Sequence, residues 1–153
     1  MKKEITIAAS SAVALILFFG SVSYLLFPQV TVQGTTASID VYTQKNGKGA
    51  NKPSGNFALN ETVIIYAEVR NASNMPVGGR YPSFEVDWPI NDTTNGLVRN
   101  VLILSTNKTD ASGIAWIRFR IPPTPNSIGK WLVYSTVDVD GQLVVDTLPF
   151  FVQ

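Results

Sequence analysis

Two different hydrophobic patterns divide this chain of 153 residues. Residues 5–27 are an unbroken run without a charged side chain, whereas from residue 30 onward apolar and polar residues alternate. A long apolar run is typical of a membrane-spanning helix, and alternation with period two is typical of half-buried β-strands. We therefore expect a cytoplasmic tip and transmembrane anchor at 1–27, a linker at 28–36, and a β-domain at 37–153.

The apolar run from Ile5 to Phe27 is long enough to cross a bilayer. At ~1.5 Å per residue, a helix of this length extends roughly 34 Å, against a hydrocarbon core of about 30 Å. Lys2 and Lys3 lie on its short flank, which favours a cytoplasmic amino terminus and an extracellular domain. Pro28 ends the helix. The chain is thus predicted to be a single-pass protein of the cell membrane.

Two alternatives stay open for this segment. Ser21-Val22-Ser23 offers a cleavage site for a signal peptide, although the apolar run continues beyond it to Phe27. A processed pilin leader is cut after Gly or Ala next to the charged region, and Lys3-Glu4-Ile5 contains neither.

Small residues in membrane helices are common, but they also let a second helix approach closely. Those on the inner half of this run are Ala8, Ala9, Ser10, Ser11 and Ala14.

The alternating part of the chain predicts seven strands separated by turns rich in Gly, Pro, Asn and Asp. Their regular spacing, with one apolar face each, favours an all-β, seven-stranded β-sandwich. Asp140-Gly141 predicts a two-residue hairpin turn between the last two strands. The strands are expected at residues 37–44, 61–71, 83–89, 98–106, 114–122, 131–139 and 142–152.

The alternation also assigns each side chain to a face of its strand. In the strand at 83–89, Phe84, Val86 and Trp88 are expected to point inward, and Glu85 and Asp87 outward. The inward residues of two further strands are expected to be Val63, Ile65, Ala67 and Val69, and Ala115, Ile117, Phe119 and Ile121.

Composition excludes several kinds of chemistry. The chain has no cysteine and no histidine, so thiolate nucleophiles, Ser-His-Asp triads, iron–sulfur clusters and His-ligated copper or haem are ruled out. Beyond residue 27, ten basic and ten acidic residues balance, which gives no electrostatic reason to expect nucleic acid binding. Asp138, Asp140 and Asp146 could ligate calcium, but turn positions account for them. We expect no catalytic residue, cofactor or metal.

Four Asn-X-Ser/Thr sequences occur, and all lie at predicted loops or strand ends. The pattern indicates N-glycosylation of an extracellular domain. The alternative is that Asn and Thr serve here as ordinary turn and strand residues. The candidate acceptors are Asn60, Asn71, Asn91 and Asn107.

Outward-facing aromatic residues are the candidates for binding a protein partner. Tyr66, Trp116 and Tyr134 fall on the outward register of their strands, and Arg118 and Arg120 follow Trp116 on the same face. Trp, Tyr and Arg dominate the binding energy of protein interfaces. Two alternatives remain: a long loop covers this face, or the assignment of inward and outward faces is reversed. An edge strand could also bind a partner by strand addition.

Two segments resemble bacterial-type Ig-like and macroglobulin-like domains. FALNETVIIYAEVRNASNMPVGG is similar to the family's entry into its second strand and the Asn-rich turn after it. TDASGIAWIRFRIP is similar to the family's glycine turn and following strand. The sequence departs from the pattern at Asn60, where Gly is usual, and it lacks tandem repeats. The resemblance implies an Ig-like sandwich, and domains of this family act as spacers, adhesins or interaction modules.

The sequence therefore predicts a non-catalytic, membrane-anchored cell-surface domain that serves as an interaction or structural module of the cell envelope. The layout of one anchor and one β-sandwich also resembles archaeal envelope proteins. A first alternative is an accessory single-span subunit of a membrane redox complex, such as the small subunit of thiosulfate:quinone oxidoreductase. A second alternative is a subunit of a surface filament.

Overall fold

The computed structural model describes residues 36–49, 52–89 and 101–153. The predicted anchor at 5–27 and the acceptor Asn91 lie outside the described residues. Within them, no helix has the length and apolar character needed to cross a membrane. The strands are β1 (Ser38–Thr43), β2 (Asn56–Phe57), β3 (Thr62–Arg70), β4 (Ser83–Asp87), β5 (Val101–Thr106), β6 (Ile114–Arg120), β7 (Gly129–Val139) and β8 (Gln142–Val152), with a 3₁₀ turn η1 (Pro125–Ser127) before β7.

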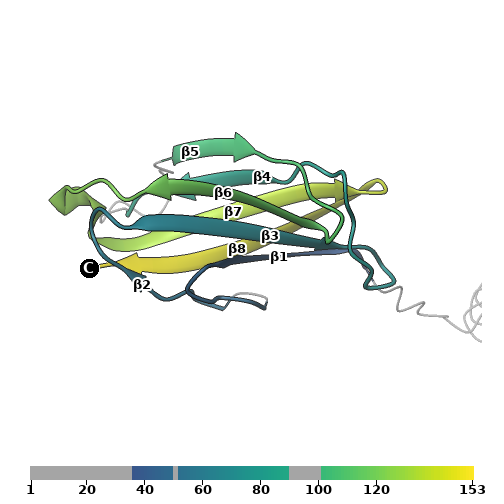
Figure 1. The fold of residues 1–153 in the computed structure, drawn as a ribbon, viewed down its shortest axis with the longest axis horizontal. Coiled ribbons are helices and arrows are strands. Elements are labelled where there is room, and N and C mark those ends of the chain that lie inside the picture. The colour runs from purple at the N-terminus through teal and green to yellow at the C-terminus, as the bar shows by residue number, and fades with distance from the viewer. Residues whose placement is uncertain (1–35, 50–51, 90–100) are drawn as a thin grey trace, which may run out of the picture. The chain divides into compact units, whose positions relative to one another are not determined.

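The strands form two sheets packed face to face (Figure 1). One has three strands in the order β1-β3-β6, and the other has five in the order β2-β8-β7-β4-β5. All neighbouring strands are antiparallel except β2 and β8. The described residues thus contain eight strands rather than the seven predicted. The additional strand, β2, has two residues and is too short to show an alternating pattern.

The core lies between the sheets and follows the predicted inward faces. Val63, Ile65, Ala67 and Val69 of β3 are fully buried. In β6 and the residue after it, Ala115 and Ile121 are fully buried, while Ile117 and Phe119 are partly buried and pack against the core. In β4, Phe84 and Val86 are fully buried. Trp88, just after β4, packs against the core and is partly buried. The predicted inward faces of these strands are therefore confirmed.

Trp131 of β7 fills the centre of this core and is fully buried. Its ring stacks against Trp88, Phe119 and Phe150 at centroid distances of 5.3, 5.8 and 5.6 Å. Its indole Nε1–H donates to the carbonyl oxygen of Ser127 in η1 at 2.8 Å, so the one polar group of the side chain has a partner. This cluster joins both sheets to the loop before β7.

Asp87, which is predicted to face outward like Glu85, is nevertheless buried, with an exposed fraction of only 4%. Its strand, β4, lies between β5 and β7, so residues of both neighbours flank the side chain. Val101 and Leu132 are the residues directly opposite Asp87. The alternating pattern gives the face of a side chain but not the position of its strand within the sheet.

The hairpin between β7 and β8 turns at Asp140 and Gly141, as predicted. Both residues have positive φ, 54° and 84°, which is what a two-residue type I′ turn requires. The carboxylate of Asp138 accepts a hydrogen bond from the backbone N–H of Gly141 at 3.0 Å. Local turn chemistry therefore explains this segment.

Side chains of β8 close the free edge of β1 in the opposite sheet. Asp146 is buried, and its carboxylate accepts the backbone N–H of Val41 at 2.8 Å. The side-chain oxygen of Gln142 accepts the backbone N–H of Ala37 at 3.2 Å. These bonds occupy donors that an added strand would need, so β1 is a poor site for strand addition.

Candidate functional site

Three aromatic residues form a row across the outer face of the three-stranded sheet. The strand register places Tyr42 of β1 opposite Tyr66 of β3, and Tyr66 opposite Trp116 of β6. The rings of Tyr42 and Tyr66 stack at a centroid distance of 5.2 Å with an interplanar angle of 17°. The exposed fraction of Trp116 is 46%, so the row ends in a large accessible ring. We call these three residues the aromatic row.

An ion cluster adjoins the aromatic row on the same face. Glu68 is only 6% exposed although it points outward. Its carboxylate binds Lys48 Nζ at 2.7 Å and Arg70 Nε at 2.9 Å, and Arg70 Nη2 contacts it as well. Arg70 also donates to the carbonyl oxygen of Asn74 at 2.8 Å. We call Lys48, Glu68 and Arg70 the ion cluster.

Pairing keeps the ion cluster charged near neutral pH. Burial alone would raise the pKa of Glu68, but hydrogen bonds from Lys48 and Arg70 outweigh it, so the pKa lies below its usual value. The hydrogen bond to Glu68 also raises the pKa of Lys48. The cluster is therefore a fixed set of charges and does not exchange protons near neutral pH.

The loop after β1 brings Lys48 to this face. Gly49 donates its backbone N–H to the carboxylate of Asp40 at 2.9 Å, which holds the loop beside β1. Lys48 Nζ then lies 5.0 Å from the centre of the Tyr42 ring. Burial is the main reason that the pKa of Tyr42 is raised. A loop thus covers the β1 side of the face, while Trp116 on the β6 side stays exposed.

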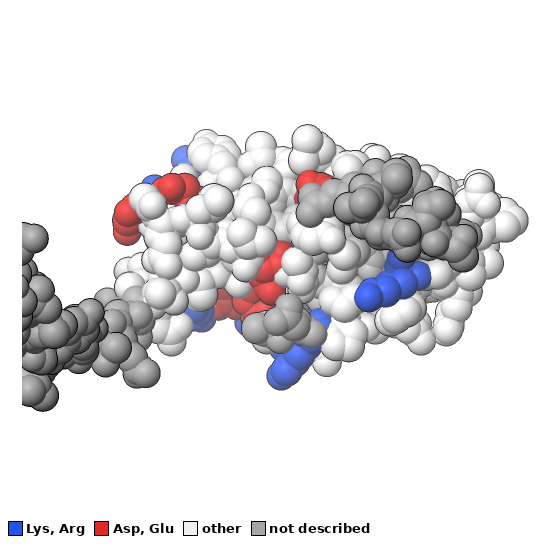
Figure 2. All heavy atoms as spheres, turned by 180° about the vertical axis from the view of Figure 1, so that it is seen from behind, with Lys and Arg blue, Asp and Glu red and all other residues white. Residues whose placement is uncertain are grey.

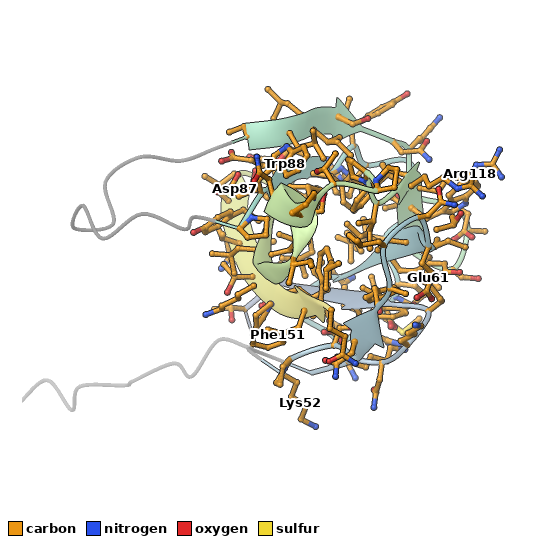
Figure 3. The ribbon with its side chains drawn as sticks, turned by 90° about the vertical axis from the view of Figure 1, so that its left-hand side faces the viewer. Lys52, Glu61, Asp87, Trp88, Arg118 and Phe151 are labelled. Atoms are coloured by element: carbon orange, nitrogen blue, oxygen red, sulfur yellow. The ribbon has the colours of Figure 1, made fainter. Side chains whose placement is uncertain are left out.

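Four of the five predicted interaction residues lie together on this face. Tyr66 and Trp116 belong to the aromatic row, and Arg118 and Arg120 follow on the outward register of β6. Figure 3 shows Arg118 pointing away from the sandwich, on the side opposite Asp87 and Trp88. Tyr134 is on β7 in the other sheet, opposite Glu85. It therefore cannot share one contact surface with the other four.

Sequence reasoning missed Tyr42, Lys48 and Glu68 as members of this surface. Alternation along β1 does place Tyr42 outward, and this signal was available. Lys48 comes from a glycine-rich loop whose path no periodicity predicts. The burial of Glu68 depends on the path of that loop, so the sequence pattern does not predict it either.

The described glycosylation candidates each have a local structural role or setting. Asn60 is exposed in a turn with φ of 66°, a backbone conformation that Asn tolerates well. The side-chain oxygen of Asn71 accepts two backbone N–H groups of its own turn. Asn107 donates its side-chain N–H to the carbonyl oxygen of Trp116 at 2.7 Å.

The three aspartates weighed as calcium ligands bind different partners. Asp138 caps the hairpin turn, Asp146 binds the edge of β1, and Asp140 pairs with Arg80. Among the described residues, no group of His, Cys, Asp and Glu is arranged to hold a metal ion.

The strand order defines the class of the described domain. The three-stranded sheet β1-β3-β6 faces β8-β7-β4-β5, which is the A-B-E against G-F-C-C′ arrangement of Ig-like β-sandwiches. No protein-family model matches the chain, and no curated protein matches its sequence. The comparisons with solved structures therefore concern the fold alone.

Several solved structures match the chain at low similarity. The PmoD soluble domain from a Methylocystis species is 10% identical, with a TM-score of 0.46 over 76% of this chain and 90% of that one. A superoxide reductase (neelaredoxin) from Ignicoccus hospitalis is 6% identical, with a TM-score of 0.47 over 82% and 87%. Spo0M, a sporulation control protein from Bacillus subtilis, is 14% identical, with a TM-score of 0.44 over 77% of this chain. The chain spans about half, 49%, of Spo0M. Similarity at this level says nothing about activity or partners.

Proposed function

We propose that this protein is a non-catalytic, membrane-anchored interaction module of the cell envelope. The apolar run at 5–27 supports the anchor, and the two lysines before it support an extracellular domain. The aromatic row, with Arg118 beside it, is the surface that binds a protein partner. The same row is the observation that carries the proposal.

The chemistry of the row suits protein binding. Trp, Tyr and Arg are the side chains that most often dominate interface energetics. Stacking of Tyr42 on Tyr66 and the pairing of Glu68 hold the surface in one arrangement before binding, so little conformational entropy is lost when a partner docks. Trp116 and Arg118 supply the accessible anchor groups.

The residues of this surface are poorly suited to catalysis. General acid–base catalysis requires a group whose pKa lies near the working pH. The pKa values of Glu68 and Lys48 are shifted away from neutrality, in opposite directions, by their mutual hydrogen bond. The absence of His and Cys from the whole chain supports the same proposal.

Site-specific photo-crosslinking in native membranes tests the proposal. A benzophenone amino acid replaces Trp116 in the full-length chain, and Leu104 on the other sheet is replaced as the matched control, since it is also exposed. We expect one cross-linked membrane or envelope protein from position 116 and none from position 104. Arg118→Glu, in the same chain, is expected to remove the cross-link because it reverses the charge beside the row.

The outcomes separate the proposal from its alternatives. A cross-link to a polytopic redox enzyme would make the partner a membrane complex, and a ladder of copies of this chain would instead indicate a filament. Equal cross-linking from positions 116 and 104, or none from 116, would overturn the assignment of the binding surface.

Glycosylation and retention of the anchor form part of the same proposal. We propose that Asn60, Asn71, Asn91 and Asn107 are acceptors, and that residues 5–27 remain in the mature chain. The intact mass of protein purified from its native membrane reports both. A mass that lacks the first 23 residues would instead support a cleaved signal peptide.

A further inference from the structure

One end of the sandwich gathers the strand connections through which the chain enters the domain. The start of β1 lies there, together with the loops β3–β4 and β5–β6 and the hairpin between β7 and β8 (Figure 1). The register agrees, because Ser38 pairs with Arg70 and Val139 pairs with Gln142. We call this the entry end.

The most exposed of the large apolar side chains lie mainly at the entry end. Four of the five most exposed large hydrophobic residues of the described chain belong to it: Met75 at 60%, Tyr81 at 62%, Leu143 at 69% and Val145 at 56%. Met75 lies in the β3–β4 loop, Tyr81 precedes β4, and the other two begin β8. Exposed apolar residues are ordinary when scattered, but a group rimmed by polar residues marks a contact surface.

The entry end is held together by contacts between its loops. Thr109 of the β5–β6 loop is buried and exchanges two backbone hydrogen bonds with the β3–β4 loop, at 2.9 Å to Gly79 and 2.8 Å to Arg80. Arg80 also pairs with Asp140 at the hairpin tip. Lys108 Nζ lies 6.0 Å from the centre of the Tyr81 ring. The β3–β4 loop, which carries Met75 and Tyr81, is therefore held against its neighbours.

The short length of chain before β1 favours the lipid bilayer as the partner of this surface. From Phe27, the end of the predicted span, to Thr36 there are nine residues, which reach at most ~30 Å when extended. A segment tethered this closely experiences an effective concentration of order mM, so even a weak contact with the bilayer is populated. We propose that the entry end docks on the lipid bilayer, with Met75, Tyr81 and Leu143 in its interfacial layer. This inference rests on the proposed membrane anchor.

The charges of the entry end suit a contact that does not depend on anionic lipid. Arg70 is paired with Glu68 and Arg80 with Asp140, and Lys108 lies two residues from Asp110 in the β5–β6 loop. Figure 2, seen from behind the view of Figure 1, likewise shows mostly uncharged side chains with charged ones in small groups. Tyr is favoured at the membrane interface, and Lys and Arg can extend toward head groups. Docking on neutral phosphatidylcholine should therefore change little with salt.

Single-cysteine labelling of the full-length chain tests the proposal, since the natural chain has no cysteine. A fluorophore is placed at Met75→Cys or Leu143→Cys at the entry end, and at Ile128→Cys or Phe151→Cys at the far end, in phosphatidylcholine vesicles that carry a head-group quencher. The eleven residues of β7 separate the two ends by ~36 Å, so we expect at least about threefold stronger quenching at the entry end. Equal quenching at both ends would mean that the domain lies flat or tumbles freely, and would overturn the proposal.

A second variant series shows whether the apolar residues cause the docking. With the label at exposed Ser112→Cys, the triple change Met75→Ser, Tyr81→Ser and Leu143→Ser should abolish most of the quenching, and Leu104→Ser should leave it unchanged. Undiminished quenching in the triple variant would also overturn the proposal. Vesicle flotation of each labelled chain is read in parallel. A chain that does not float contradicts the anchor, whereas one that floats without quenching at 75 and 143 contradicts only the docking.

Discussion

The two outer faces of the sandwich differ in how their side chains are held. On the three-stranded sheet, Tyr42 stacks on Tyr66 within the aromatic row and the ion cluster is paired, so these side chains are fixed in place. On the five-stranded sheet, the exposed Leu104 stands opposite Glu85, and the hydroxyl groups of Ser83 and Thr136 are hydrogen-bonded at 2.7 Å. The narrower sheet therefore presents stacked rings and paired charges, and the wider one presents exposed aliphatic side chains among smaller polar contacts.

This difference indicates where specificity and where stability reside. Residues fixed by several partners lose little entropy on binding, whereas isolated exposed aliphatic residues mainly affect solubility. Both faces rest on the same core, and changes in that core should affect them equally. Substitutions in the core and on each face separate these contributions.

Replacing Trp131 should have the largest effect because both sheets pack on it. Trp131→Ala removes three ring contacts and leaves a cavity, so we expect a loss of about 3–5 kcal/mol in the free energy of unfolding. Denaturant unfolding of the described domain measures it. Leu104→Ala on the outer face of the five-stranded sheet is the control, because this side chain is 75% exposed, and it should stay within about 0.5 kcal/mol. Similar losses for the two would contradict the separation of face from core.

Removing the carboxylate that joins the two sheets should have the next largest effect. Asp146→Ala leaves the N–H of Val41 buried without its acceptor, and we expect a loss of about 1–3 kcal/mol. Hydrogen exchange should accelerate at the Val41 amide. Asp140→Asn removes only an exposed ion pair with Arg80 and should cost less than about 1 kcal/mol. Unchanged exchange at Val41 in Asp146→Ala would contradict the edge-closing role.

The sequence predicts the features of the fold that depend on residues close together in the chain, and not those that depend on residues far apart. Alternation within β3 and β6 correctly assigned inward residues, and Asp140-Gly141 correctly located the hairpin, since both signals are local. Which strands share a sheet is set by packing of residues far apart in the chain. For that reason the sequence does not show that Tyr134 and Trp116 lie on different sheets, or that Asp146 accepts the backbone N–H of Val41.

The ion cluster should make stability depend on pH. The pKa of Glu68 is lowered in the folded state, so its contribution is present above the pKa of the unfolded chain and is lost as pH falls through the folded pKa. Glu68→Gln should therefore destabilise by about 1–2 kcal/mol at neutral pH, a difference that shrinks in acid. Unfolding of both chains across pH 2–7 checks it. Glu61→Gln, which removes the charge of an exposed pair with Lys45, should have a smaller effect. A pH-independent difference for Glu68→Gln would contradict the charged state of the cluster.

The outer face of the five-stranded sheet should tolerate substitution better than the outer face of the three-stranded sheet. Leu104 is 75% exposed on the edge strand β5, so Leu104→Lys removes no buried contact and should leave stability within about 0.5 kcal/mol. A lysine on an edge strand also opposes pairing with another chain. We therefore expect less concentration-dependent self-association by sedimentation velocity, with partner cross-linking from position 116 unchanged. If Leu104→Lys instead abolished that cross-link, the partner would contact the five-stranded sheet, and the preorganised face would not be the binding surface.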